Sequence, residues 1–511
     1  MSLSPSFIDL RRGEKVPLAP TLKTIKRVGI KEVKNFLSLE SDKELPSRPL
    51  RVGILFSGGP APGGHNVIAG LFDAITELGP GNKLLGYLAG PQGLLDGKCK
   101  EMTSNLVNEY RNLGGFHMLG SGRTKIETED DFQKAEQVCK SHKLDALVFV
   151  GGDDTNTNAA LLDEYLKKCG TSCTVVGVPK TIDGDLKSPL IETSFGFDTA
   201  CKVYSEMIGN ICLDAASSGK YSHFIKLMGR KASHVTLECA LQTQPNLAFI
   251  GEEVEEKKQS LADIVSTIAD CVSQRAAEGR NYGVYLIPEG LLEFIPEFKE
   301  LISALNRHLA KGEGEDALSG KQKGLFDSLP QAIKGQLLHD RDPHGNVQVS
   351  KIETEKLVYE MVDTELKKRG FKGKFNPVSH FFGYEGRCSA PSCFDATYCY
   401  NLGYVAAVLI NHKKSGCMAA LKKLSQPVEN WQPIAVLIDS MLVEEERKGK
   451  MMRVIDKSVV KMNGPAFVEF TKKRRDWQLF DQYQSPGPIQ YYGASKNVVN
   501  KTLAIEDVDQ R

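Results

Sequence analysis

The sequence predicts an α/β protein with two doubly wound, mainly parallel sheets, a helical insertion and an N-terminal arm. Three observations support this fold class. Short apolar runs alternate with helix-periodic segments along much of the 511 residues, several of these runs end in glycine-rich or polar turns, and aspartates cluster after two successive runs. Alternation of this kind is typical of βαβ units, whose parallel strands carry helices on both faces.

Composition and charge indicate an ordinary globular enzyme. The chain is 41% hydrophobic and 25% charged, and at roughly 100 to 200 residues per domain it predicts about three units, or two large ones with an insertion. The net charge of +1 gives no support for binding to nucleic acid or membrane. The start MSLSPSFIDLRRGEK has no apolar core and no apolar run approaches 18 residues, so we expect a soluble, cytoplasmic protein.

The cysteines and histidines carry no metal-site or disulfide signature. Twelve cysteines form no C-x-x-C pair, and ten histidines form no H-E-x-x-H pattern. In a chain without a signal peptide, we expect reduced thiols rather than bridges or a zinc site.

The predicted strands and helices follow the chain in order. An apolar run ends in the glycine-rich turn 57–66, and the helix behind that turn closes at Gly79. A short helical pattern is expected at 30–39 in the arm, and further helices at 198–213 and 402–409. Strands are predicted at 51–56, 83–89, 146–150, 173–178, 223–228, 247–251, 282–287, 378–382 and 434–438.

The turn 57–66 is typical of a phosphate cradle. Its missing side chains let backbone N–H groups approach oxygen, and the following helix turns the positive end of its dipole toward the same point. The turn matches neither the Walker A pattern nor G-x-G-x-x-G, so alone it is a weak signal.

The stretch 145–185 carries the strongest chemical pattern in the chain. A strand enters the turn GGDD at 151–154, a helix follows to about Lys167, and a second strand runs into PKTIDGD at 179–185. The carboxyl ends of neighbouring strands form the ligand crevice of an open α/β sheet. Four carboxylates and one lysine there suit Mg²⁺ and a phosphoryl group, with one carboxylate left as a base. The alternative is that this stretch forms a pair of capped turns that have no catalytic or binding role.

These motifs resemble the phosphofructokinase family, in particular its pyrophosphate-dependent branch. GGDDTNTNAALL and PKTIDGD carry the resemblance, which spans about residues 51–403. In ATP-using members glycines stand at the positions of Asp154 and Lys180 and leave room for nucleotide. A carboxylate and an ammonium there remove volume, and the carboxylate repels the α-phosphate of a nucleotide, whereas pyrophosphate ends sooner. Lys180 is expected to offer pyrophosphate a mobile point charge.

The resemblance also assigns the remaining site residues. Asp183 is the expected base, Asp153 the Mg²⁺ ligand, and Asp154 and Lys180 further catalytic groups. Pyrophosphate is expected on Gly58, Gly59, Arg123 and Lys180. Substrate-binding positions are Thr181, Ile182, Asp183, Asp185, Lys220, Tyr221, Met228, Gly229, Arg230, Glu289, Tyr384, Glu385, Gly386 and Arg387.

The resemblance implies a reversible, Mg²⁺-dependent transfer from pyrophosphate to the 1-hydroxyl of fructose 6-phosphate. Lys220 and Tyr221 are expected to reach a neighbouring subunit's substrate, so we expect a homodimer or higher oligomer with active sites near the subunit interface. Two alternatives stay open: an ATP-dependent 6-phosphofructokinase, and a non-catalytic regulatory subunit of a hetero-oligomer. Against the second, the aspartates and arginines of the motifs are all in place.

The expected organisation divides the chain into five parts. An arm covers 1–47, and a phosphate-donor domain covers 48–190 and is completed by C-terminal segments. A fructose 6-phosphate domain is expected over 191–292 and 375–430, a helical insertion over 293–374, and a C-terminal segment packed on the core over 431–511.

Overall fold

The computed structural model describes residues 7–44, 48–341, 347–447, 450–489, 491 and 499–508. The chain forms two compact units. Unit 1 comprises Met1–Ala200, Tyr384–Ser458 and Ile489–Asp507, and unit 2 comprises Cys201–Gly383, Val459–Pro488 and Val508–Arg511. The predicted boundaries differ from this division, because residues 384–430, which we assigned to the second domain, belong to unit 1.

Unit 1 is built on one large sheet, which has ten strands among the described residues. Its centre is parallel, and the apolar runs predicted from the sequence form it: Val52 to Phe56 are all buried in β3. The path of the sheet is β1 (Val28–Val33), β2 (Phe36–Ser41), β14 (Gln432–Leu437), β13 (Cys417–Lys422), β7 (Thr174–Thr181), β6 (Ala146–Gly151), β3 (Arg51–Phe56), β4 (Lys83–Tyr87) and β5 (Cys99–Glu101), with β8 (Phe195–Gly196) beside β7.

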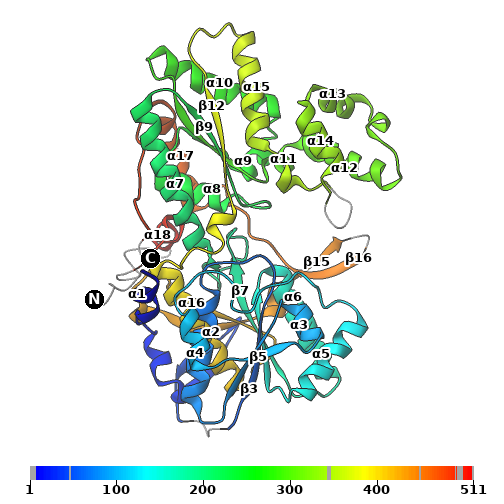
Figure 1. Cartoon of the computed structure of the whole chain (residues 1–511), viewed down its shortest axis with the longest axis vertical. Helices are drawn as coiled ribbons and strands as arrows, with labels where there is room; N and C mark the ends of the chain where they lie inside the picture. Colours follow the sequence, from blue (N-terminus) through cyan, green and yellow to red (C-terminus); the bar gives the residue numbers. More distant parts are fainter. Residues whose placement is uncertain are drawn as a thin grey trace, which may run out of the picture. The chain divides into compact units, whose positions relative to one another are not determined.

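Helices cover both faces of this sheet, as the doubly wound fold predicts (Figure 1). One group packs around α2 (Gly64–Leu78) and consists of α4 (Ser104–Tyr110) and α16 (Cys393–Asn411). The other group consists of α3 (Pro91–Leu95), α5 (Glu129–Ser141) and α6 (Asp153–Lys168). Unit 1 also contains α1 (Phe7–Gly13), η1 (Pro20–Arg27), η4 (Tyr384–Gly386), η5 (Val428–Asn430) and η6 (Ile438–Met441), and α18 (Lys501–Val508) begins in it.

Helix α16 is a core helix. Within the described part of the chain it alone is long and apolar enough to cross a membrane, but 94% of its apolar window is buried inside the protein. Polar residues such as Asp395 and Asn401 interrupt its apolar sequence, and for this reason it does not read as one continuous run.

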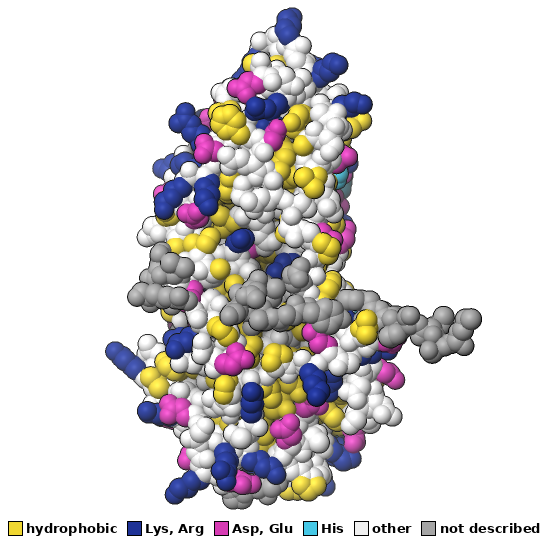
Figure 2. Space-filling model, turned by 90° about the vertical axis from the view of Figure 1, so that its left-hand side faces the viewer, with side chains coloured by type: hydrophobic (Ala, Val, Ile, Leu, Met, Phe, Trp, Pro, Cys, Tyr) yellow, Lys and Arg dark blue, Asp and Glu magenta, His cyan; other side chains and the backbone are white. Residues whose placement is uncertain are grey.

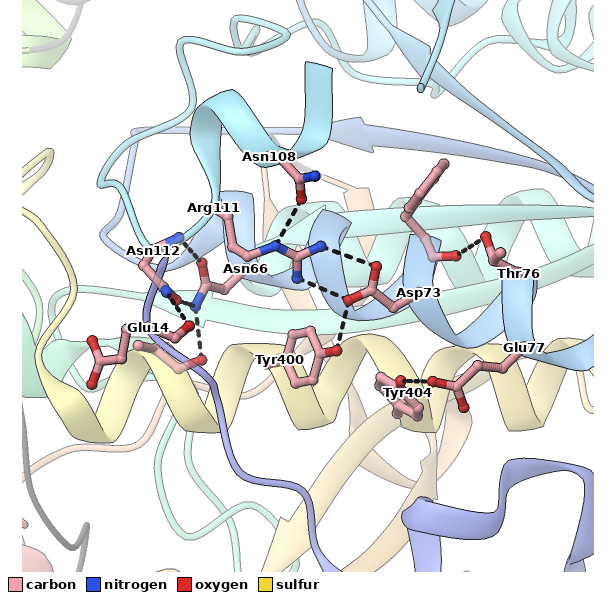
Figure 3. A network of polar contacts seen from close by, with 12 residues as sticks. Glu14, Asn66, Asp73, Thr76, Glu77, Asn108, Arg111, Asn112, Tyr400 and Tyr404 are labelled. Carbon is pink, nitrogen blue, oxygen red and sulfur yellow. Dashed lines mark hydrogen bonds and ion pairs between the residues drawn. The ribbon is translucent and has the colours of Figure 1, made fainter. Parts of the chain in front are cut away.

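A polar network joins α2 to α16 (Figure 3). Arg111 donates to both carboxylate oxygens of Asp73, at 2.8 and 3.0 Å, and the hydroxyl of Tyr400 donates to the same carboxylate at 2.6 Å. One turn further along each helix, Tyr404 donates to Glu77 at 2.7 Å. These contacts satisfy polar groups that the packing of the two helices removes from water.

Unit 2 contains a smaller sheet in the order β10 (Leu247–Ala248), β11 (Gly283–Pro288), β9 (Ser222–Leu227) and β12 (Pro377–Phe382), and all its pairings are parallel. Its core is apolar and includes Phe224, Tyr285 and Ile287. Apart from the insertion, its helices among the described residues are α7 (Phe197–Ser218), which begins in unit 1, α8 (His234–Thr243), α9 (Gly251–Glu256), α10 (Leu261–Ala277) and α17 (Pro465–Leu479).

The predicted helical insertion is present in unit 2. It consists of α11 (Leu291–Phe294), α12 (Pro296–Ala310), η2 (Glu315–Ala317), α13 (Gly320–Ser328), α14 (Gln331–His339), η3 (Val349–Lys351) and α15 (Thr354–Lys368). A buried ion pair ties its last helix to the sheet, since Lys226 of β9 lies 3.3 Å from Glu355 and donates to the carbonyl of Ile352 at 2.9 Å.

Several local predictions need correction. Residues 30–39 form no helix but the hairpin of β1 and β2, in which Leu37 and Leu39 are buried with the period of a strand. Of the strand predicted at 247–251 only Leu247–Ala248 is extended, and Gly251 already begins α9. The helix predicted at 402–409 is longer, because Ser392 caps α16 by accepting from the N–H of Asp395. The hairpin of β15 (Leu442–Arg447) and β16 (Lys450–Ile455) was not predicted.

Charges are mixed over the surface. Figure 2 shows basic and acidic side chains interspersed over the described residues of one face, in agreement with the net charge of +1.

Candidate functional site

The glycine-rich turn between β3 and α2 is held by its own backbone contacts, and the N–H of Gly58 is not open to an anion, contrary to our prediction. Gly58 has a φ of +82°, a conformation that side chains disfavour. Its N–H donates to the carbonyl of Gly122 at 2.9 Å, and its own carbonyl accepts from the hydroxyl of Ser121. The turn is therefore held against the segment that carries Arg123.

Three cationic side chains converge on this turn. A Cβ added to Gly58 would lie 3.2 Å from the Nζ of Lys180. A Cβ added to Gly59 would lie 3.7 Å from the Cζ of Arg387 and 3.9 Å from an Nη of Arg123. The glycines thus leave room in front of two arginines and a lysine, which is the charge that a compact polyanion needs.

Arg387 was predicted among the sugar-binding residues, and the structure places it in unit 1 beside the Gly59 turn. Its guanidinium lies over the ring of Tyr384, 4.8 Å from the centroid, and the side chain of Tyr384 is 68% exposed. Tyr384, Glu385 and Gly386 form the short helix η4 that precedes Arg387. The sugar-binding role of this segment stays a prediction.

Lys180 is buried rather than mobile, contrary to our expectation. Its residue is only 8% exposed, near the end of β7. Burial lowers the pKa of its ammonium to about 8, against the opposing effect of Asp183, Asp185 and Asp153. The ammonium therefore loses its proton in a range close to neutral pH.

The GGDD turn opens α6 as predicted. Asn156 donates to the carbonyls of Gly151 and Gly152, both at 2.8 Å, and closes the turn. Asp153 and Asp154 occupy the first turn of α6, where the helix dipole stabilises carboxylates. The sequence therefore sets the positions of both side chains locally.

Asp153 and Asp154 point to different surroundings. Asp154 is exposed, lies 3.8 Å from the ammonium of Lys125, and lines a cavity of about 360 Å³. Residues of α5, α6 and β16, among them Phe132, Tyr165 and Met452, form most of the cavity wall. Apart from Asp154, none of the residues that line this cavity is a predicted site residue.

The PKTIDGD segment continues β7 to Thr181, three residues beyond the predicted end of the strand. The hydroxyl of Thr181 donates to Asp185 at 2.8 Å and accepts from the N–H of Asp183 at 3.0 Å. Ile182, which lies between Thr181 and Asp183 in the sequence, is buried, and Asp183 is partly exposed. This local network orients the aspartates at the edge of the sheet.

Lys457 is the site residue that the sequence did not reveal. Its Nζ lies 3.0 Å from Asp185 and 3.3 Å from Asp153, and the N–H of Ser458 donates to the carbonyl of Asp185 at 2.8 Å. Burial lowers the pKa of Lys457, but the two aspartates outweigh burial and hold that pKa above its usual value. No local motif marks this lysine, which stands 272 residues from Asp185.

The carboxylates of Asp153 and Asp185 converge on one cation, so these oxygens fit a metal ion as well. Mg²⁺ is commonly held by one or two carboxylates, with phosphate oxygens and waters completing its six ligands. Among the described residues no group of three or more His, Cys, Asp or Glu side chains forms a metal site by itself. Two carboxylates are the ligands that a Mg²⁺ site of this kind takes from the protein.

A second group of predicted residues lies in unit 2. Met228, Gly229 and Arg230 follow β9, and Glu289 follows the neighbouring strand β11 and donates its N–H to Leu227 at 2.8 Å. Arg230 lies 3.6 Å from the carboxylate of Glu293. The parallel pairing thus brings these predicted residues to one edge of the small sheet.

Lys220 and Tyr221 are not part of that group. They precede β9, whereas Met228 follows it, and six strand residues separate the two ends by about 20 Å. Both side chains are exposed. Within one chain they do not join the edge formed by Arg230 and Glu289.

The fold and the site define a phosphofructokinase-like α/β protein. The chain belongs to the phosphofructokinase family, because the family model described as Phosphofructokinase matches residues 51–410. Two mainly parallel sheets with helices agree with this family, so the predicted fold class is confirmed.

Individual relatives are close. A protein of Arabidopsis thaliana named pyrophosphate--fructose 6-phosphate 1-phosphotransferase subunit beta 2 is 51% identical over 477 residues, which are 91% of this chain and 84% of that protein. An Entamoeba histolytica protein named pyrophosphate--fructose 6-phosphate 1-phosphotransferase is 51% identical over 476 residues, 90% of this chain and 87% of that protein. The solved structure of pyrophosphate-dependent phosphofructokinase from Nitrosospira multiformis matches with a TM-score of 0.56 at 15% identity, covering 87% of this chain and 96% of that chain. It bears on the fold alone.

Proposed function

We propose that this protein reversibly transfers a phosphoryl group from pyrophosphate to the 1-hydroxyl of fructose 6-phosphate, giving fructose 1,6-bisphosphate and phosphate. The observation that carries the proposal is the convergence of Lys180, Arg123 and Arg387 on the Gly58–Gly59 turn. A small donor of high charge fits three cations around a glycine turn. The relatives at 51% identity bear the name of this reaction.

Asp183 is the proposed base. It removes the proton of the 1-hydroxyl as that oxygen attacks phosphorus, and its N–H is held by the hydroxyl of Thr181 at 3.0 Å. Phosphoryl transfer depends on positioning and charge neutralisation more than on covalent help. Lys180 and Arg123 beside the glycine turn supply that neutralisation.

We assign Mg²⁺ to Asp153, with Asp185 as a second carboxylate. The support is the convergence of both carboxylates on one cation, the ammonium of Lys457. When bound, Mg²⁺ neutralises charge on the oxygens of pyrophosphate.

Pyrophosphate is preferred to a nucleotide because of Asp154 and Lys180. The carboxylate of Asp154 repels an α-phosphate, and the buried side chain of Lys180 fills space beside Gly58. Pyrophosphate has only two phosphate groups, so neither effect disfavours its binding.

The sugar phosphate is assigned to Arg230 and Glu289, which follow neighbouring strands at one edge of the small sheet. Lys220 and Tyr221 lie at the opposite end of β9 and are exposed, which supports a homo-oligomer in which they serve a neighbouring subunit's substrate. The Arabidopsis thaliana relative is named as a subunit, which agrees with an oligomeric protein.

Twelve free cysteines favour a reducing compartment, and we place the protein in the cytoplasm.

The variant Asp183→Ala tests the proposed chemistry. It should abolish turnover of pyrophosphate and fructose 6-phosphate while fructose 6-phosphate still binds with about the original affinity by titration calorimetry, because the carboxylate acts on the proton in the transition state. Asp476→Ala, a change at an exposed aspartate of α17, is the matched control and should keep full activity. Full activity of Asp183→Ala would show that the base is another group.

A further inference from the structure

Lys457 holds two carboxylates of the donor site from outside the predicted motifs. Its ammonium bridges Asp185 at 3.0 Å and Asp153 at 3.3 Å. These are the two carboxylates that we assign to Mg²⁺. The ammonium therefore occupies the charge position that a metal ion at Asp153 would take.

Hydrogen bonds hold the backbone around Lys457, and the side chain is partly exposed. The N–H of Ser458 donates to the carbonyl of Asp185 at 2.8 Å, and the N–H of Ile455 donates to the hydroxyl of Thr157 on α6 at 3.2 Å. The side chain itself is 28% exposed. An ammonium on a flexible four-carbon stem can leave Asp153 without any change in these backbone contacts.

We propose that Lys457 is a tethered counter-ion, which neutralises the Asp153–Asp185 pair in the resting protein and yields more readily to a metal ion that arrives with its phosphate donor than to the free ion. The inference rests on the proposed function, in that it takes Asp153 and Asp185 as the metal-binding pair.

Charge compensation gives the reason for this selectivity. A free divalent cation at the pair must displace the ammonium, and the ammonium then loses both carboxylates without a replacement. A metal bound to pyrophosphate brings phosphate oxygens, which offer the displaced ammonium new partners. Lys457 thus weakens the binding of the free metal ion more than it weakens the binding of the metal–donor complex.

The test is the binding of Mn²⁺ alone to the full chain, measured by electron paramagnetic resonance without pyrophosphate or sugar. Lys457→Met and Lys457→Gln should bind free Mn²⁺ about tenfold more tightly than the unchanged protein, because the carboxylate pair has lost its internal cation. Lys457→Arg retains the charge and should bind Mn²⁺ as the unchanged protein does. A double variant with Asp153→Asn should lose the gain, which places the tightened site at Asp153.

Arg453 provides the matched control. It lies on β16, close before Lys457, and pairs with Glu164 at 2.7 Å and Asp439 at 3.1 Å, away from the Asp153–Asp185 pair. Arg453→Met should leave the Mn²⁺ affinity unchanged. Equal or weaker Mn²⁺ binding by folded Lys457→Met and Lys457→Gln would overturn the proposal.

A measurement on the unchanged protein gives an independent answer if a variant does not fold. Saturating Mn²⁺ should release the ammonium and raise the rate at which acetic anhydride acetylates Lys457, followed by mass spectrometry. Lys167, which pairs with Asp163 on the far part of α6, is the internal reference. An unchanged ratio of the two rates would refute displacement. A chain that binds Mn²⁺ as expected but fails to use pyrophosphate would refute the proposed function and leave this inference intact.

Discussion

The protonation of Lys180 depends on its buried position near the end of β7. Its ammonium is buried beside Gly58, with Asp183, Asp185 and Asp153 as acidic neighbours and Arg387 as a basic one. Burial outweighs the three carboxylates, so the ammonium is charged below about pH 8 and neutral above it. The motif PKTIDGD predicted the position of this lysine, but its burial depends on contacts with the Gly58 turn, which is distant in the sequence.

The pH dependence of catalysis should report this group. We expect kcat/KM for pyrophosphate to fall as the pH rises through about 8, because the donor site then loses a positive charge. Lys180→Arg should be less active but should keep its remaining activity to higher pH, since a guanidinium stays charged. A flat profile up to pH 10 in the unchanged protein would contradict a charged role for Lys180.

Gly58 allows a second prediction for a single residue. Gly58→Ala should lower kcat/KM for pyrophosphate by about tenfold or more, because a methyl group at φ +82° is strained and stands 3.2 Å from the Nζ of Lys180. Gly81→Ala is the control, since Gly81 has a similar φ of +83° and nothing within 4 Å of the added atom. Equal activity losses in the two variants would mean that strain, and not crowding of Lys180, explains the effect.

Among the secondary-structure elements, the parallel strands were predicted well and the sheet edges were not. Strands such as β3 and β6 are continuous apolar runs because both of their faces are covered by helices. The hairpin of β1 and β2 joins the sheet through β2, which pairs with β14, about 400 positions away in the chain. Their sequences carry a weaker pattern, and a single sequence does not indicate such distant pairings.

The packing of α2 on α16 supports the glycine turn, and its polar network makes a stability prediction. Asp73→Ala should lower the free energy of unfolding by about 2 kcal/mol, because it leaves Arg111 and Tyr400 without their shared acceptor. Urea titration of the full chain measures this change.

Asp327→Ala is the control for that measurement. It removes an exposed helical ion pair with Lys323 and should cost about 0.5 kcal/mol or less. A loss for Asp73→Ala no larger than that of the control would contradict the stabilising role of the network.

For the whole molecule, the connectivity of the chain explains why the motifs did not reveal every residue of the site. Unit 1 receives three separate stretches of the chain, and unit 2 is inserted between them. The GGDD and PKTIDGD motifs reveal Asp153, Asp154, Lys180 and Asp183 because each motif is continuous. Lys457 and Arg387 reach the same site from later stretches, so their neighbours there became visible only in the folded chain.

The most direct measurement of the central claim is the turnover of fructose 6-phosphate by the purified chain alone, with Mg²⁺ and either pyrophosphate or ATP. Turnover should be at least about 100-fold faster with pyrophosphate, because Asp154 and Lys180 oppose a nucleotide and not a bare phosphoanhydride. Turnover by the isolated chain also distinguishes an enzyme from a regulatory subunit. Strong activity with ATP and none with pyrophosphate would contradict the account.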